Sequence, residues 1–323
     1  MLLNLRNSMI YPAMQLCDIC PRNCRVNRYQ QAGFCGAPAE LVVNLHTLHH
    51  GEEPSLSGIH GSGTIFFSWC NLRCVYCQNH NLSVLGWGHE ISYSELSQVM
   101  LDLQQSGAHN INLVTPTHYT PQIVEAIKQA KENGLTIPLV WNSSAYEKVS
   151  TLQMLEGLID IYLPDYKYAH GVYAHKYSSA ADYPATALAA VREMCRQVGT
   201  LQLDAEGIAV KGVIIRLLVL PEGLSGTRKT LQVIAEELGT QHTLSIMGQY
   251  YPAGDASKYP ELQRGITELE YNAVVDAATE LGFSHFYTQE LSCSDTWTPH
   301  FAPKPTLDNL QPPDFNPITE QNL

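Results

Sequence analysis

The sequence lacks long apolar runs, clusters of basic residues and an apolar leader. No stretch reaches the ~20 uninterrupted apolar residues that a membrane span needs, and residues 1–14 contain neither a basic start to a long apolar stretch nor a small-residue cleavage site. Lysine and arginine number 19 against 31 aspartate and glutamate residues, and the net charge is −12. We therefore expect a cytoplasmic protein whose main partner is neither a membrane nor a nucleic acid.

Nine cysteines are present, and seven of them precede residue 78. In a chain without a secretory signal, cysteines that gather in this way favour metal or redox chemistry over a disulfide framework. The apolar fraction of 45% predicts an ordinary folded core, and 323 residues suffice for one large α/β barrel or for two smaller domains. Metal chemistry is therefore expected in the N-terminal quarter.

Cys70, Cys74 and Cys77 have the spacing Cys-x3-Cys-x2-Cys. Three thiolates suit a four-iron cluster with one iron unclaimed, whereas clusters used only for electron transfer normally take four cysteines. A zinc site is the alternative, but it needs four ligands, and His80 is the nearest candidate for the fourth. The spacing favours an iron-sulfur cluster whose open iron binds a small molecule.

With Tyr76 directly before its last cysteine, this loop resembles the signature of the radical S-adenosylmethionine (SAM) superfamily. The resemblance implies a [4Fe-4S] cluster and SAM as cofactors, with the open iron holding the amino and carboxylate groups of SAM. It implies a reductant protein such as flavodoxin or ferredoxin, and a 5′-deoxyadenosyl radical that abstracts a substrate hydrogen atom. Tyr76 would lie near the adenine, or would shield the cluster from water.

From residue 61 onward, short apolar runs alternate with helical patterns, which is typical of parallel βα units. Strands are predicted at 64–68, 110–114, 137–141, 159–163, 213–220 and 244–250, with an extra one at 285–288; helices are predicted at 94–105, 121–133, 147–156, 185–198, 227–238 and 268–281. Ser94 is the expected cap of the first helix. Six units resemble the partial (β/α)6, TIM-like barrel of radical SAM enzymes, and the cysteine loop would lie at the rim where the strands end.

We expect three segments: an N-terminal extension at 1–60, the barrel at 61–295 and a proline-rich tail at 296–323. The extension contains four cysteines in the spacing Cys-x2-Cys-x3-Cys-x10-Cys: Cys17, Cys20, Cys24 and Cys35. Four thiolates could complete the coordination of a zinc ion or of an auxiliary iron-sulfur cluster, and the sequence does not choose between them. Free thiols are the remaining alternative.

Asp165 and Lys167 follow a predicted strand as Asp-x-Lys. This strand end is similar to the motif by which glycyl-radical-enzyme activases of the pyruvate formate-lyase type hold SAM. Lys167 would then pair with the methionyl carboxylate, and Asp165 would orient that region. The alternative is a weak surface ion pair.

Other strand ends are loosely similar to the same activases, namely residues 141–144, 215–221 and 249–254. The resemblance makes Asn142, Ser144, Arg216 and Gln249 candidate cofactor-binding residues. Where the family has a Gly-Gly-Glu-Pro run for the SAM amino group, this chain has Thr115-Pro116-Thr117-His118. Thr117, His118 and backbone carbonyls would take that part, or SAM would sit differently.

Glu52 and Glu53 precede the first predicted strand; they could face the rim, but a solvated pair in a surface loop is the more common outcome.

The expected function is that of a radical SAM oxidoreductase similar to activating enzymes, with a glycyl radical enzyme or another protein as its partner. A radical SAM catalyst acting on a small molecule or peptide is the alternative. A non-catalytic zinc or iron-sulfur scaffold or electron carrier is disfavoured, because electron transfer does not require an iron with an open coordination site.

Overall fold

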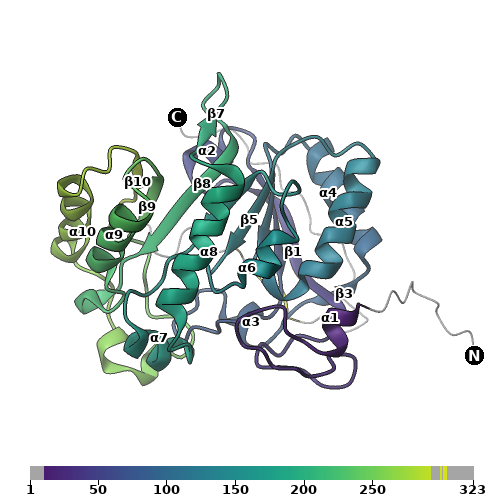
Figure 1. Cartoon of the computed structure of the whole chain (residues 1–323), viewed down its shortest axis with the longest axis horizontal. Coiled ribbons are helices and arrows are strands. Elements are labelled where there is room, and N and C mark those ends of the chain that lie inside the picture. The colour runs from purple at the N-terminus through teal and green to yellow at the C-terminus, as the bar shows by residue number, and fades with distance from the viewer. Residues whose placement is uncertain (1–10, 292–298, 300, 304–323) are drawn as a thin grey trace, which may run out of the picture.

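The computed structural model describes residues 11–291, 299 and 301–303. At its centre is a sheet with the strand order β10-β9-β8-β6-β5-β4-β2-β1-β3 (Figure 1). The parallel strands are β2 (Ser62–Phe67), β4 (Ile111–Val114), β5 (Leu139–Ser143), β6 (Ile161–Pro164), β8 (Ala209–Leu218), β9 (Thr243–Met247) and β10 (Phe286–Thr288). Each overlaps a predicted strand, so the predicted α/β partial barrel is confirmed.

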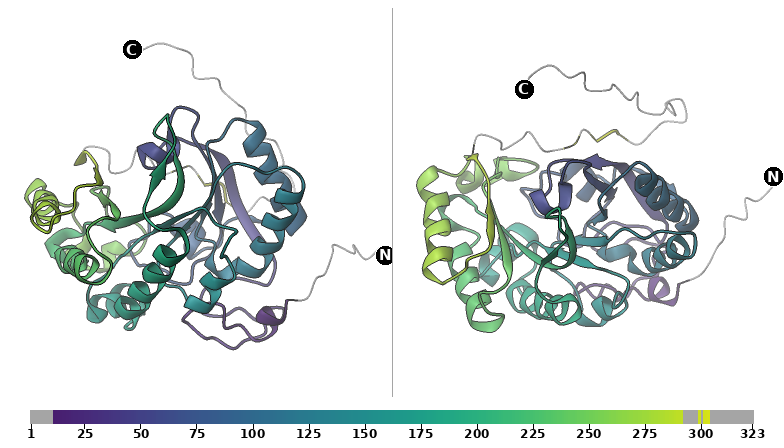
Figure 2. Two further views of the ribbon diagram at one scale, coloured as in Figure 1. Left: turned by 45° about the horizontal axis from the view of Figure 1, so that its top comes forward. Right: turned by 90° about the horizontal axis from the view of Figure 1, so that it is seen from above.

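Helices cover the outer face of this curved sheet (Figure 2). The predicted ones are α4 (Tyr93–Gln105), α5 (Thr120–Glu132), α6 (Val149–Gln153), α8 (Tyr183–Val198), α9 (Thr227–Glu237) and α10 (Glu268–Glu280). The predicted cap of α4 was wrong by two residues. The hydroxyl of Ser92 accepts from the Glu95 N–H at 3.1 Å, while the Glu95 carboxylate accepts from the Ser92 N–H at 2.7 Å. Each side chain therefore pairs the backbone N–H of the other residue, which is a capping box.

Short elements that the sequence did not predict connect the units. They are α1 (Pro12–Gln15), α2 (Pro54–Ser57), α3 (His80–Ser83), α7 (Gly171–Ser178) and the 3-10 turns η1 (Thr117–Tyr119), η2 (Pro221–Gly223), η3 (Ala256–Lys258) and η4 (Pro260–Leu262). Across the described ranges, we find no helix with both the length and the apolar character that crossing a bilayer requires. The predicted tail at 296–323 lies outside the described residues, apart from 299 and 301–303.

Three further strands extend the sheet. β1 (Leu41–His49) pairs antiparallel with β2, in a register that places Thr47 opposite Thr64; β3 (His89–Ile91) pairs antiparallel with β1, and β7 (Gln202–Leu203) with β8. The segment boundary predicted at residue 60 therefore falls after a strand of the barrel's own sheet.

The short helix α2 lies against the inner face of the sheet. Successive residues of a strand point to opposite faces of the sheet. Along β5, β6 and β8, one set of alternate residues packs against the helices of the outer face, and the other set contacts α2 on the inner face. Leu56 of α2 is fully buried among this second set: Val140, Ile161, Leu163, Ala209 and Ile214. Burial of such a side chain contributes about 1.5–3 kcal/mol, so α2 is a structural part of the barrel interior.

Candidate iron-sulfur and cofactor site

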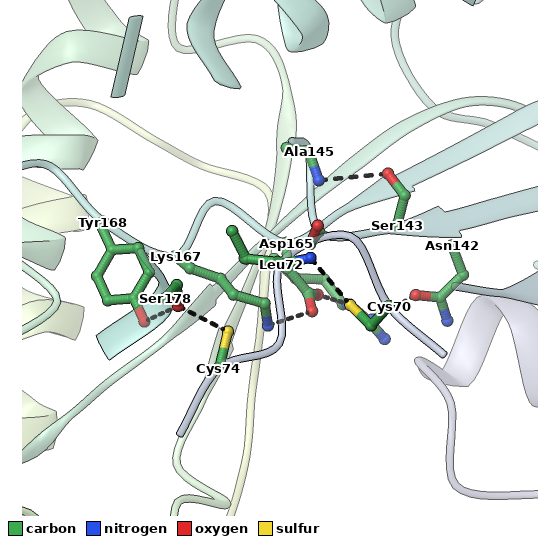
Figure 3. Close-up of polar contacts among 12 residues, drawn as sticks. Cys70, Leu72, Cys74, Asn142, Ser143, Ala145, Asp165, Lys167, Tyr168 and Ser178 are labelled. Carbon is green, nitrogen blue, oxygen red and sulfur yellow. Dashed lines mark hydrogen bonds and ion pairs between the residues drawn. The ribbon is translucent and has the colours of Figure 1, made fainter. Parts of the chain in front are cut away.

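The three loop cysteines follow β2 directly and line one cavity of about 700 Å³. Cys70 and Cys74, shown in Figure 3, are only 8% and 7% exposed. The loop is held at its base because the ring of His118 donates from Nε2 to the Ser68 carbonyl at 2.8 Å. The predicted position of the loop at the strand-end rim agrees with this geometry.

Hydrogen-bond donors already point at two of these sulfur atoms. The Leu72 N–H donates to Cys70 Sγ at 3.3 Å, and the Ser178 hydroxyl donates to Cys74 Sγ at 3.1 Å (Figure 3). Burial raises the pKa of Cys70 to about 12 and also raises that of Cys77, so neither sulfur is a stable free thiolate without a cation. Buried sulfurs with donors directed at them fit the ligand set of an iron-sulfur cluster.

No group of three or more His, Cys, Asp or Glu side chains in the part of the chain that the structure describes is arranged to hold a single metal ion. A four-iron cluster makes a different demand, because each thiolate binds its own iron and the sulfurs need not converge on one point. The three loop cysteines therefore fit a cluster that is held by one thiolate per iron.

Asp165 links two basic side chains at the end of β6. Its carboxylate accepts from Lys167 Nζ at 2.7 Å and from Arg216 Nε at 2.5 Å, and Arg216 Nη2 donates to Asn142 Oδ1 at 2.6 Å. Burial alone would raise the pKa of Asp165, but Arg216 and Lys167 outweigh it and lower the pKa, so the carboxylate stays ionised. The two side chains are each 16% exposed and line the cavity, so this is not a solvent-exposed surface ion pair.

Most of the predicted cofactor-binding residues line the same cavity as the cysteines. They are Tyr76, Asn142, Ser144, Asp165, Lys167, Arg216 and Gln249. The ring of Tyr76 packs edge-on against three tyrosines, Tyr168, Tyr177 and Tyr250, with centroids 5.9–6.4 Å away. Tyr76 and its three tyrosine neighbours form a cluster of aromatic rings behind the cavity wall that Tyr76 lines.

Thr117 and His118 are not among the residues that line the cavity. The 3-10 turn η1 directs the Thr117 hydroxyl to the buried Glu147 carboxylate at 2.8 Å and uses the His118 ring to hold the Ser68 carbonyl. Burial lowers the pKa of His118 to about 3, so the ring is neutral. Both residues position the loop and the strand ends, and the structure gives no support to their predicted contact with SAM.

Two features of the cavity were missed from the sequence. Thr115, which lines it, has a φ of +59°, a conformation that strains a β-branched residue and is typical of functional sites. The interpretation of Glu52 and Glu53 as a solvated pair was wrong, since both line the cavity and Glu53 is 8% exposed. The position of Thr115 within the run that replaces Gly-Gly-Glu-Pro was the signal that could have identified it.

The four N-terminal cysteines form a compact hairpin and loop. The Cys17 N–H donates to the Val26 carbonyl at 2.9 Å, and the Phe34 N–H donates to Cys24 Sγ at 3.3 Å. A Cβ at Gly33 would lie 3.0 Å from Cys24 Sγ, so glycine allows the close approach. Cys17, Cys20 and Cys35 are buried and Cys24 is half-buried.

Arg22 connects this module to the cysteine loop of the barrel. Its side chain donates to the Asn71 carbonyl at 2.9 Å, to the Ser178 carbonyl at 2.7 Å and to the Ser179 carbonyl. Its guanidinium also lies over the ring of Phe34, 3.7 Å from the centroid. One side chain next to Cys20 therefore braces both the loop between Cys70 and Cys74 and the end of α7.

Comparison with known proteins gives a family match over the cysteine loop. Residues 57–177 match the family described as a 4Fe-4S single cluster domain. An uncharacterized protein of Methanocaldococcus jannaschii is 29% identical over 294 residues, which cover 88% of this chain and 81% of that protein.

Several solved structures share part of the fold. SuiB of Streptococcus suis is 12% identical over 72% of this chain, with a TM-score of 0.49. The FeFe-hydrogenase maturase HydG of Carboxydothermus hydrogenoformans is 15% identical over 68% of this chain, with a TM-score of 0.44. Methylornithine synthase is 14% identical over 75% of this chain and 74% of its own chain, with a TM-score of 0.46. The chain spans about half of the SuiB chain (50%) and of the HydG chain (56%).

The cysteine spacing, its place after the first parallel strand of a partial barrel and the match to a 4Fe-4S domain agree with one another. Residues 57–177, which contain the cysteine loop together with Asp165 and Lys167, are therefore similar to a 4Fe-4S single cluster domain.

Proposed function

We propose that this protein is a radical SAM enzyme that cleaves SAM reductively and abstracts a hydrogen atom from a substrate held in the 700 Å³ cavity. The observation that supports it is the meeting of the three loop cysteines with the Lys167, Asp165 and Arg216 network in that cavity. A cavity of this size accommodates a cofactor and a small substrate group.

Each part of the site has a distinct task. Cys70, Cys74 and Cys77 would hold the cluster, which together with SAM supplies a reductant-driven source of a 5′-deoxyadenosyl radical. Among the described residues, the Lys167 ammonium donates to Asp165, which leaves further N–H groups for the methionyl carboxylate. The tyrosine cluster around Tyr76 would exclude water, which would limit quenching of reactive species.

Two classes of substrate remain within this proposal. The resemblance of the Asp165 and Lys167 strand end supports a glycyl-radical-enzyme activase, served by flavodoxin or ferredoxin. The carboxylates in the cavity instead support a small molecule or a peptide side chain that carries a basic group.

The direct test is anaerobic reconstitution with iron and sulfide, followed by reduction and addition of SAM. We expect 5′-deoxyadenosine and methionine in equal amounts. A preparation that contains the cluster and is reduced, yet forms no 5′-deoxyadenosine with SAM and whole cell extract, would contradict the proposal.

Lys167→Ala is expected to weaken SAM binding by about 1.5–3 kcal/mol, the range for a charged hydrogen bond, or roughly ten- to hundredfold in Kd. Titration calorimetry on the reconstituted protein measures this. Lys128→Ala, which removes an exposed lysine of α5, is the matched control. An unchanged Kd in a Lys167 variant with normal iron content would show that the Asp-x-Lys resemblance is coincidental.

A further inference from the structure

Charged side chains follow one another across the cavity, starting at the cluster loop. Lys167 interacts electrostatically with Cys74 and Cys77 and pairs with Asp165. Asp165 pairs with Arg216, and Arg216 Nη1 donates to Glu52 Oε2 at 3.2 Å. The series therefore runs from the thiolates to the carboxyl groups next to α2, which form the other end of the cavity.

Of the two basic residues in this series, Arg216 is fully occupied by the protein itself, whereas Lys167 keeps N–H groups for the SAM carboxylate. Arg216 donates from Nε to Asp165, from Nη2 to Asn142 and from Nη1 to Glu52, so each of its nitrogens has a partner. Glu52 is also satisfied, because its Oε1 accepts from Asn112 Nδ2 at 2.8 Å. Among the described residues, Arg216 therefore offers no unpaired nitrogen to an anionic group that enters beside Glu52 and Glu53.

Glu53 is different. It lines the cavity and is more than nine-tenths buried, yet its Oε2 has no hydrogen-bond partner among the residues that the structure describes. A buried carboxyl oxygen without a partner costs about 1–3 kcal/mol or more. The other ionisable neighbours at this end are His49 and His50, and burial lowers the pKa of His49, which is therefore neutral. A ligand that donates a hydrogen bond would satisfy Glu53.

We propose that Glu52 and Glu53 form the substrate subsite, and that the substrate presents a protonated amine or guanidinium to Glu53. This inference rests on the proposed function, because it takes the amino and carboxylate groups of SAM to be held at the open iron and by Lys167. Glu53 is the first residue before α2, and its carbonyl accepts from the Leu56 N–H at 2.7 Å, so a rigid element holds the carboxyl group in place.

The state of Glu53 without a ligand agrees with this role. Burial, with the nearby Glu52, raises the pKa of Glu53, while Arg216 opposes the shift. A cation placed next to the carboxyl group would lower that pKa. If Glu53 is protonated before binding, a cationic substrate therefore displaces its proton. A neutral or anionic substrate would release none.

The first experiment uses the reconstituted wild-type protein and a metabolite extract separated on ion-exchange resins into cationic, neutral and anionic fractions. We expect only the cationic fraction to raise the rate of 5′-deoxyadenosine formation, with hydrogen transfer from that fraction into the product. Stimulation by the anionic or the neutral fraction, or the same rate with all fractions, would overturn the inference. Absence of SAM cleavage under every condition would instead contradict the proposed function.

The second experiment compares Glu53→Gln, Glu53→Asp and, as a control on the surface, Glu206→Gln, which lies in the exposed turn between β7 and β8. Gln should raise the concentration of cationic fraction needed for half-maximal stimulation at least tenfold, Asp should retain part of the effect, and Glu206→Gln should resemble wild type. Iron content and circular dichroism identify any misfolded variant. Equal stimulation of Glu53→Gln and wild type, or a tenfold loss of SAM affinity in Glu53→Gln, would overturn the assignment to substrate.

Discussion

Replacement of Cys70, Cys74 and Cys77 by alanine should remove the cluster beside β2 and abolish formation of 5′-deoxyadenosine. The three sulfurs line the same cavity as Lys167, and no other set of cysteines in the described residues follows a barrel strand. A cluster deprived of its thiolates has no ligands in this loop, so the loss should be complete rather than partial.

Product analysis by chromatography after reduction with dithionite measures this loss. Cys195→Ala provides a matched control, because Cys195 is a half-buried thiol on α8 and does not line the cavity. Continued production of 5′-deoxyadenosine by the triple variant would refute the assignment of the cluster.

Changing Cys17, Cys20, Cys24 and Cys35 to serine should remove a second metal centre and make the N-terminal segment sensitive to protease. Small metal-binding modules depend on their ion for order. We propose that this centre is an auxiliary iron-sulfur cluster, with a zinc ion as the alternative that the same four thiolates could hold. The wild type should then contain about eight irons, and the variant about four.

Iron and zinc analysis separates the alternatives. About four irons with one zinc in the wild type would assign a zinc site to the module and contradict the cluster. Identical metal contents and identical protease resistance in both proteins would show four ordinary thiols. Arg22→Ala keeps all four thiols but removes the donors to Asn71 and Ser178, so it tests separately whether the module braces the cysteine loop.

The parallel strands and the position of the cysteine loop could be predicted because they depend on local patterns. Strands buried on both faces form continuous apolar runs, such as residues 161–164, and the chain direction then places every strand-end loop at one rim. Lys167 and Asp165 follow such a strand by one to three residues, so their position also follows from the pattern.

The roles of Thr117 and His118 and the burial of Glu53 could not be predicted, because they depend on contacts between segments that are distant in the sequence. Thr117 and His118 also follow a strand, but a 3-10 turn directs them to Glu147 and to the Ser68 carbonyl, and the sequence contains no sign of that turn. The burial of Glu53 comes from α2, a four-residue helix too short to show a periodic pattern.

The position of β1 and α2 also determines at which residue the chain can be truncated without loss of its fold. A chain that began at residue 61 would match the domain boundary expected from the sequence, yet it would lose the partner strand of β2 and the Leu56 side chain inside the barrel. The unpaired edge of β2 would then offer free N–H and C=O groups for intermolecular pairing. Such a shortened protein should precipitate during refolding, whereas one that begins at residue 40 keeps the strand that protects the edge.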